Sequence, residues 1–110
     1  MNIDLIKWMV RYAEGYHLKT IHGLDAIDYG EEVESLEDFS SCESIARSHL
    51  LTRVIEGINK KGTDLGFYIE QLSEQVVVER TSEPYKLFEH MPIDQAKEEA
   101  LKYIYEQETK

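Results

Sequence analysis

The first residues whose types could support catalysis are Cys42 and His49, a thiol and an imidazole seven positions apart in one predicted helix. A cysteine nucleophile needs a base with its nitrogen about 3 Å from the sulfur. On a helix with a rise of 1.5 Å per residue, this spacing separates the two backbones by about 10 Å. We therefore interpret Cys42 as a structural cysteine and predict no catalytic residue at this pair.

Histidine and aspartate side chains, which are common metal ligands, are concentrated at His17, His22, Asp25 and Asp28. Their spacing matches no established zinc pattern. The acidic residues that follow lack the alternating Asp/Asn positions, the central glycine and the final glutamate of a calcium loop. We predict no metal site.

Motifs of cofactor binding and hydrolysis are also missing. Residues 61–63, Lys-Gly-Thr, form only the end of a phosphate-binding P-loop, without the preceding glycine or strand. Neither a Gly-x-Ser-x-Gly elbow nor a His-Glu-x-x-His helix occurs. The sequence therefore predicts a protein that is not an enzyme and has no cofactor.

The distribution of charge is the most unusual feature of the chain. The 22 Asp and Glu residues outnumber 12 Lys and Arg residues, for a net charge of −10. This sign disfavours direct binding to nucleic acid or to anionic membranes, because both are polyanions. Residues 20–46 contain no lysine or arginine but eight acidic residues, of which seven are candidate partner-binding residues: Asp25, Asp28, Glu31, Glu32, Glu34, Glu37 and Asp38.

Two interpretations of this acidic segment remain open. One is a solvated, ordered loop, with a helical turn, that places negative charge before a helix. The other is a negative face that binds a basic protein surface, which includes mimicry of nucleic-acid phosphates toward a host protein that binds nucleic acid. Seven tyrosines among 11 aromatic residues favour a protein interface, because a tyrosine can bury its ring and keep its hydroxyl in water.

The elements that position these residues begin with an amphipathic helix. Leu5, Trp8, Met9 and Tyr12 recur at helical spacing, and we expect the helix to end at Gly15. Trp8 is predicted to be a core residue. Residues 16–21 alternate weakly and indicate a short strand.

A second helix is predicted from a capping box, in which Ser40 and Glu43 each bind a free backbone N–H group. The helix should run to about Asn59 and end at Gly62, and Gly57 should cost about 1 kcal/mol relative to alanine. Residues 66–90 are rich in aromatic and β-branched residues, with short breaks, and indicate two or three antiparallel strands.

A final helix is expected after Pro92, and it should fray over Glu106–Lys110. The predicted fold is α+β: three helices packed on a small antiparallel sheet of two to four strands, in a single acidic domain, residues 1–110. We expect the core to contain Trp8, Leu50, Val54, Ile69, Val77 and Ile104. The absence of a leader or an apolar span, together with a lone cysteine, predicts a cytoplasmic protein.

Three segments carry a resemblance: residues 5–10 with 13–15, residues 50–59, and residues 93–107. Together they resemble small uncharacterised accessory proteins of phages and prophages of Gram-positive bacteria. The resemblance implies a bacterial host, a protein partner and no catalytic residue. The expected function is non-enzymatic protein binding, with host-directed inhibition through the acidic face. A structural or self-assembling virion or scaffold component, including a homodimer, is the alternative.

Overall fold

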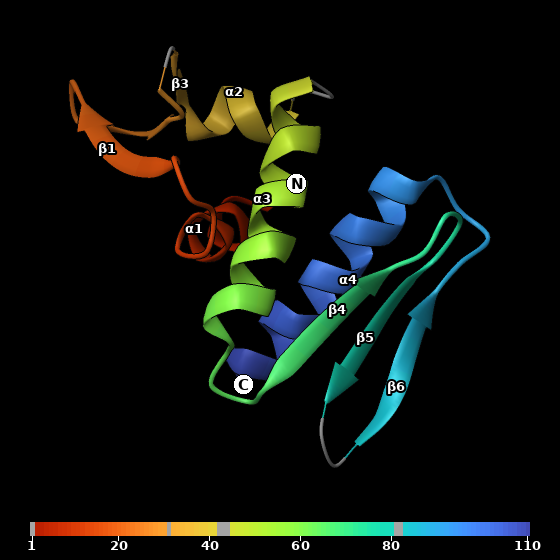
Figure 1. Ribbon diagram of the computed structural model, residues 1–110. Helices are drawn as coiled ribbons and strands as arrows, with labels where there is room; N and C mark the ends of the chain where they lie inside the picture. The colour runs from red at the N-terminus through yellow and green to blue at the C-terminus, as the bar shows by residue number, and fades with distance from the viewer. Residues whose placement is uncertain (1, 31, 42–44, 81–82) are drawn as a thin grey trace.

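The computed structural model describes residues 2–30, 32–41, 45–80 and 83–110, with the side chains of residues 45–46 and 83–85 excepted. These residues form four helices and two three-stranded sheets (Figure 1). In chain order they are α1 (Ile3–Val10), β1 (His17–Ile21), β2 (Leu24–Asp28), β3 (Val33–Ser35), α2 (Leu36–Ser41), α3 (Ile45–Lys61), β4 (Phe67–Gln71), β5 (Val76–Arg80), β6 (Glu83–Phe88) and α4 (Ile93–Glu108).

The predicted α+β class is confirmed, and the predicted layout of three helices on one sheet matches only roughly. A second sheet, which we call sheet A, is formed by β1, β2 and β3, and a fourth helix, α2, follows it. Both lie where we expected only a strand and an ordered loop. Acidic residues are rare in strands, so the acidic composition of residues 24–35 did not indicate strands there. The strand pairing of this segment depends on its packing in the fold, which composition does not report.

Sheet B, made of β4, β5 and β6, is an antiparallel meander, as predicted for residues 66–90. Helices α3 and α4 cover one of its faces, and no other described element lies on the opposite face (Figure 1). The covered face contributes Phe67, Ile69, Val76 and Val78 to the core. Sheet B is therefore a single layer with one face open to solvent.

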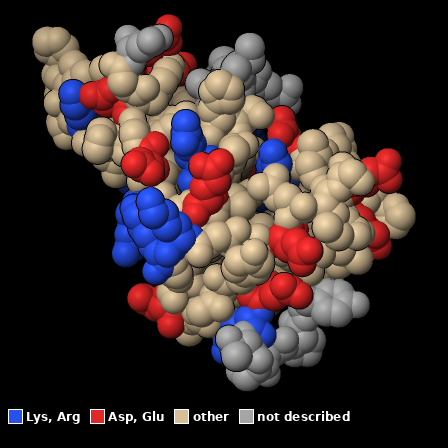
Figure 2. Space-filling model, viewed as in Figure 1, with Lys and Arg blue, Asp and Glu red and all other residues tan. Residues whose placement is uncertain are grey.

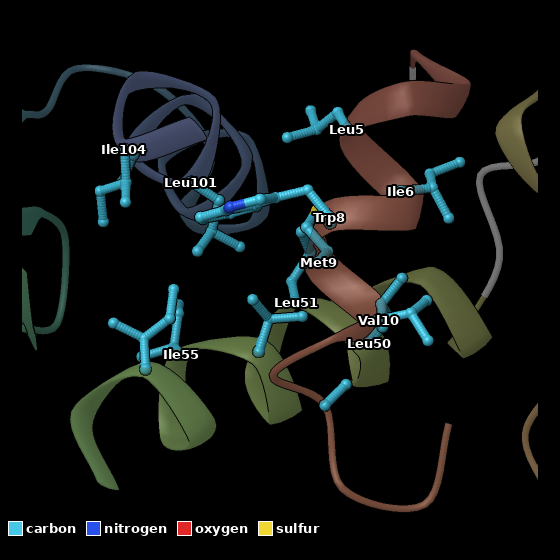
Figure 3. Close-up of a cluster of buried hydrophobic side chains, with 14 of the residues drawn as sticks. Leu5, Ile6, Trp8, Met9, Val10, Leu50, Leu51, Ile55, Leu101 and Ile104 are labelled. Carbon is cyan, nitrogen blue, oxygen red and sulfur yellow. The ribbon is translucent and has the colours of Figure 1, made fainter. Parts of the chain in front are cut away.

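The core lies where α1 crosses α3 and α4 (Figure 3). Trp8 is buried there, and its ring packs against the rings of Tyr12 and Tyr105 at centroid distances of 5.2 and 5.7 Å. The buried residues also include five of our six expected core residues: Trp8, Leu50, Val54, Ile69 and Ile104. Val77 is the exception, because it is half-buried on the open face of sheet B.

Several helix ends differ from expectation. Helix α1 ends at Val10, before Gly15, and α4 continues to Glu108. Ser40 belongs to α2, so it does not begin the long helix, and Glu43 lies outside the described residues. Gly62 does end α3: its N–H donates to the carbonyl of Ile58 at 2.8 Å, and its φ of 77° is one that glycine adopts readily.

Candidate protein-binding surface

Exposed apolar side chains are concentrated on sheet A. Among the described residues, four of the eight exposed large apolar side chains belong to its three short strands. They are Leu24, Val33, Leu18 and Ile21, with exposures of 66%, 47%, 44% and 40%. Burying such side chains is worth about 1.5–3 kcal/mol each, so their exposure needs a reason beyond folding.

The register assigns these side chains to the two faces of sheet A. Ile21 pairs with Leu24, and Asp28 pairs with Val33, so all four side chains share one face. On the opposite face Ile27 is buried in the core, while Leu18 borders a cleft of about 170 Å³ beside α1. The first face therefore exposes the apolar side chains of Ile21, Leu24 and Val33. The same face also carries the buried Ala26 and the ion pair of Lys19 with Asp28.

A tight turn holds two of these side chains together. His22 and Gly23, with φ of 51° and 80°, connect β1 to β2 as a two-residue hairpin turn. We call residues 21–24 the hairpin tip. Figure 1 shows the β1–β2 hairpin standing out from the helices, and Figure 2 shows no lysine, arginine, aspartate or glutamate at its projecting end. The tip thus presents Ile21 and Leu24 on a preformed backbone.

The first two predicted site residues are paired within the protein. The Asp25 Oδ2 lies 3.0 Å from the Nζ of Lys7, and the hydrogen bond between these groups raises the lysine pKa. The Asp28 Oδ2 lies 2.5 Å from the Nζ of Lys19, and the Asp28 Oδ1 accepts the Gly30 N–H at 2.9 Å. The hydrogen bond from Lys19 is the main cause of a lowered Asp28 pKa. The first pair links β2 to α1, and the second links β1 to β2 within sheet A.

The next two carboxylates share a tyrosine. The Tyr29 hydroxyl lies 2.9 Å from the Glu32 Oε2 and 3.1 Å from the Glu34 Oε2. The Tyr29 ring stacks on that of Tyr16, at 5.9 Å between centroids, and also contacts Phe39. Desolvation, followed by the two carboxylates, raises the pKa of Tyr29 well above its ordinary value. The hydroxyl therefore stays protonated and holds both glutamates at the base of sheet A.

The last two described candidates, Glu37 and Asp38, lie in the first turn of α2 and are exposed. This helix begins directly after β3, and the Ser35 Oγ accepts the Asp38 N–H at 3.1 Å. Glu31 lies outside the described residues. We call Glu32, Glu34, Glu37 and Asp38 the acidic group, because these four make no ion pair with any described lysine or arginine.

The structure thus divides the predicted acidic face into two paired aspartates and a separate acidic group. It also adds the hairpin tip, which charge analysis missed. The signal was present in the sequence: His-Gly between two apolar residues is a turn pattern, although acidic composition directed attention to the carboxylates.

The described part of the chain also bears on metal binding and on membrane insertion. There, no group of three or more His, Cys, Asp or Glu side chains is placed to hold a metal ion. Cys42, the proposed structural cysteine, lies outside the described residues. In the same described residues, no helix combines the length and apolar character needed to cross a membrane.

Comparison with known proteins finds no family model that matches this chain, and no match among curated proteins or solved structures.

Proposed function

We propose that this protein is a non-enzymatic binding protein that docks on another protein through sheet A. The observation that carries the proposal is the concentration of exposed apolar side chains on a small projecting sheet, with Leu24 at 66% exposure on a preformed turn. Protein interfaces combine an apolar centre with a polar rim. In this proposal the hairpin tip supplies the centre, and the acidic group supplies the rim.

The charges indicate the kind of partner. Asp25 and Asp28 already have lysine partners, whereas the acidic group has none among the described residues. A partner with an apolar pocket bordered by lysine or arginine would match both parts of the surface. We further propose a bacterial host protein as this partner, in keeping with the resemblance of the helical segments to phage and prophage accessory proteins.

Self-assembly through sheet A is the weaker alternative. A two-fold interface would bring the same acidic group of two copies toward each other. Like charges across an interface cost several kcal/mol unless they are separated or paired. We therefore favour a different protein as the partner, and light scattering at low and high concentration distinguishes a monomer from a homodimer.

Replacing the apolar side chains of the hairpin tip should abolish partner capture. In the double variant Ile21→Ser/Leu24→Ser, we expect binding to the partner to weaken at least tenfold, because central apolar contacts dominate interface energies. The measurement is co-purification from a bacterial host, followed by titration of the recovered protein against the purified variants. Folding should be retained, because both side chains are already exposed in the free protein.

A matched control is the variant Ile3→Ser/Leu65→Ser, which removes two exposed apolar side chains outside sheet A. It should capture the same partner with unchanged affinity. Equal capture by the tip variant and the wild type, with both folded, would show that sheet A is not the docking surface.

Neutralising the acidic group should slow association with that partner. In the variant Glu32→Gln/Glu37→Gln we expect the association rate to fall severalfold at low salt and the difference to shrink at 0.15 M salt, where the screening length is about 8 Å. Stopped-flow association kinetics over a salt series provide the test. Asp64→Asn/Glu106→Gln, which removes the same charge elsewhere, is the control, and an equal effect of both variants would refute a local role.

A further inference from the structure

The open face of sheet B is a second surface that the fold leaves uncovered. Pairing across the strands places Tyr68 beside Glu79, Glu70 beside Val77, and Val77 beside Leu87 on this face. Phe67, Ile69 and Val78 point the opposite way, into the core. Because side chains alternate along a strand, the register assigns Tyr68, Glu70, Val77 and Leu87 to this face, while an irregularity in the β5–β6 pairing lies between Val78 and Arg80.

The central strand of sheet B, β5, does not have the composition of a strand with one solvent-exposed face. Such strands alternate between apolar and polar residues. Strand β5 instead begins with three valines, Val76, Val77 and Val78, and the middle one is on the open face next to Leu87. Tyr68, which is 51% exposed, lies diagonally from Val77, and the three side chains make a diagonal apolar strip across the sheet. A strip of this kind is suited to contact with another element.

Charges in sheet B are sorted by face. Its two cationic side chains lie over aromatic rings: the Arg80 guanidinium is 5.5 Å from the ring centre of Phe67, and the Lys86 Nζ is 6.0 Å from that of Tyr103. Both rings belong to the helix-covered side. The open face carries the glutamates Glu70 and Glu79, and residues 81–85 contain no lysine or arginine. Among the described side chains of the open face, the charged ones beside the apolar strip are thus the two glutamates.

We propose that the open face of sheet B binds a basic amphipathic helix of a partner protein. The apolar side of such a helix would cover Tyr68, Val77 and Leu87, and its lysines or arginines would face Glu70 and Glu79. Three strands about 4.8 Å apart spread the strip over about 10 Å, and a helix of about 12 residues, about 18 Å long, covers it. A second copy of this chain fits less well, because it would place glutamates against glutamates.

This inference is independent of sheet A and can be tested with a defined probe. The probe is a synthetic peptide of about 18 residues made only of leucine and lysine, with leucines at i, i+3, i+4 and i+7, long enough to be helical. Its affinity for the purified protein is measured by titration calorimetry at 0.15 M salt. We expect it to bind at least tenfold more tightly than a scrambled peptide of the same composition.

Two variants locate the binding site. Val77→Thr/Leu87→Thr removes apolar surface while keeping residues that favour strands, so the protein should fold and bind the probe about tenfold more weakly. Glu70→Gln/Glu79→Gln should weaken binding and flatten its salt dependence. The tip variant Ile21→Ser/Leu24→Ser should bind the probe like the wild type, which separates this inference from the proposed function.

The opposite pattern would overturn the inference. Equal affinity for the helical and the scrambled peptide would show attraction to net charge alone. Undiminished binding by the folded Val77→Thr/Leu87→Thr variant, or loss of binding in Glu32→Gln/Glu37→Gln, would place the probe elsewhere on the protein. Circular dichroism and thermal unfolding of each variant establish that it is folded before titration.

Discussion

Replacing Gly57 by alanine should destabilise the protein by about 2–3 kcal/mol, although alanine is the better helix former by about 1 kcal/mol. The reason is a close approach of two backbones. A Cβ atom at Gly57 in α3 would lie 1.8 Å from the carbonyl oxygen of Tyr12 and 2.7 Å from its carbonyl carbon. Backbone atoms cannot change rotamer, so the segment after α1 would have to move away from α3.

Chemical denaturation of the wild type and of Gly57→Ala measures the change in the free energy of unfolding. In thermal unfolding, we expect the melting temperature of the variant to fall by about 10 °C. Ser48→Ala, elsewhere in the same helix, is the control for helix propensity and should change stability by less than about 0.5 kcal/mol. Gly57→Ala with unchanged or increased stability would mean that the backbone at Tyr12 does not approach α3 this closely.

The second large effect is expected at Asn59, whose side chain pairs with the edge strand β4. Its Nδ2 donates to the Ile69 carbonyl oxygen at 2.8 Å, and its Oδ1 accepts the Ile69 N–H at 2.8 Å. The amide thus takes the place of a neighbouring strand at this residue. Asn59→Ala leaves both backbone groups without these partners, and we expect a loss of about 2 kcal/mol, or about 1 kcal/mol for each hydrogen bond.

Two measurements test this role. Chemical denaturation gives the free energy of unfolding. Amide hydrogen exchange reports on the Ile69 N–H, which should exchange faster in Asn59→Ala than in the wild type. The exchange rates of distant core amides should change only as much as the global stability changes. Lys60→Ala, at the exposed neighbouring position, is the control and should leave both readouts nearly unchanged. Unchanged Ile69 exchange in Asn59→Ala would contradict the pairing.

Both residues show the limit of local reasoning about a helix. The sequence predicts only that Gly57 lowers helix stability and that the helix runs to about Asn59. The structure gives each a partner from another element: Tyr12 lies 45 positions earlier and Ile69 lies 10 positions later. Helix propensity describes neither contact, because it reflects the residue and its own helical turn.

Within sheet A, the sequence identified the carboxylates of the candidate site but not their arrangement. It could not show that Lys7 and Lys19 pair with Asp25 and Asp28 while Tyr29 holds Glu32 and Glu34. These contacts depend on the β1–β2 register and on α1 packing beside the sheet. The number of charged residues in the sequence reports neither the register nor the packing of α1.

The sequence by itself determined the α+β class, the long helices and the meander of sheet B, because hydrophobic periodicity is a local signal that survives in any packing. It also identified Trp8 and Ile104 as core residues. Only the tertiary structure decided which face of β5 is covered: Val76 and Val78 are buried, while Val77 lies on the open face. Three consecutive valines carry no alternation, so the positions of α3 and α4 alone select the buried face.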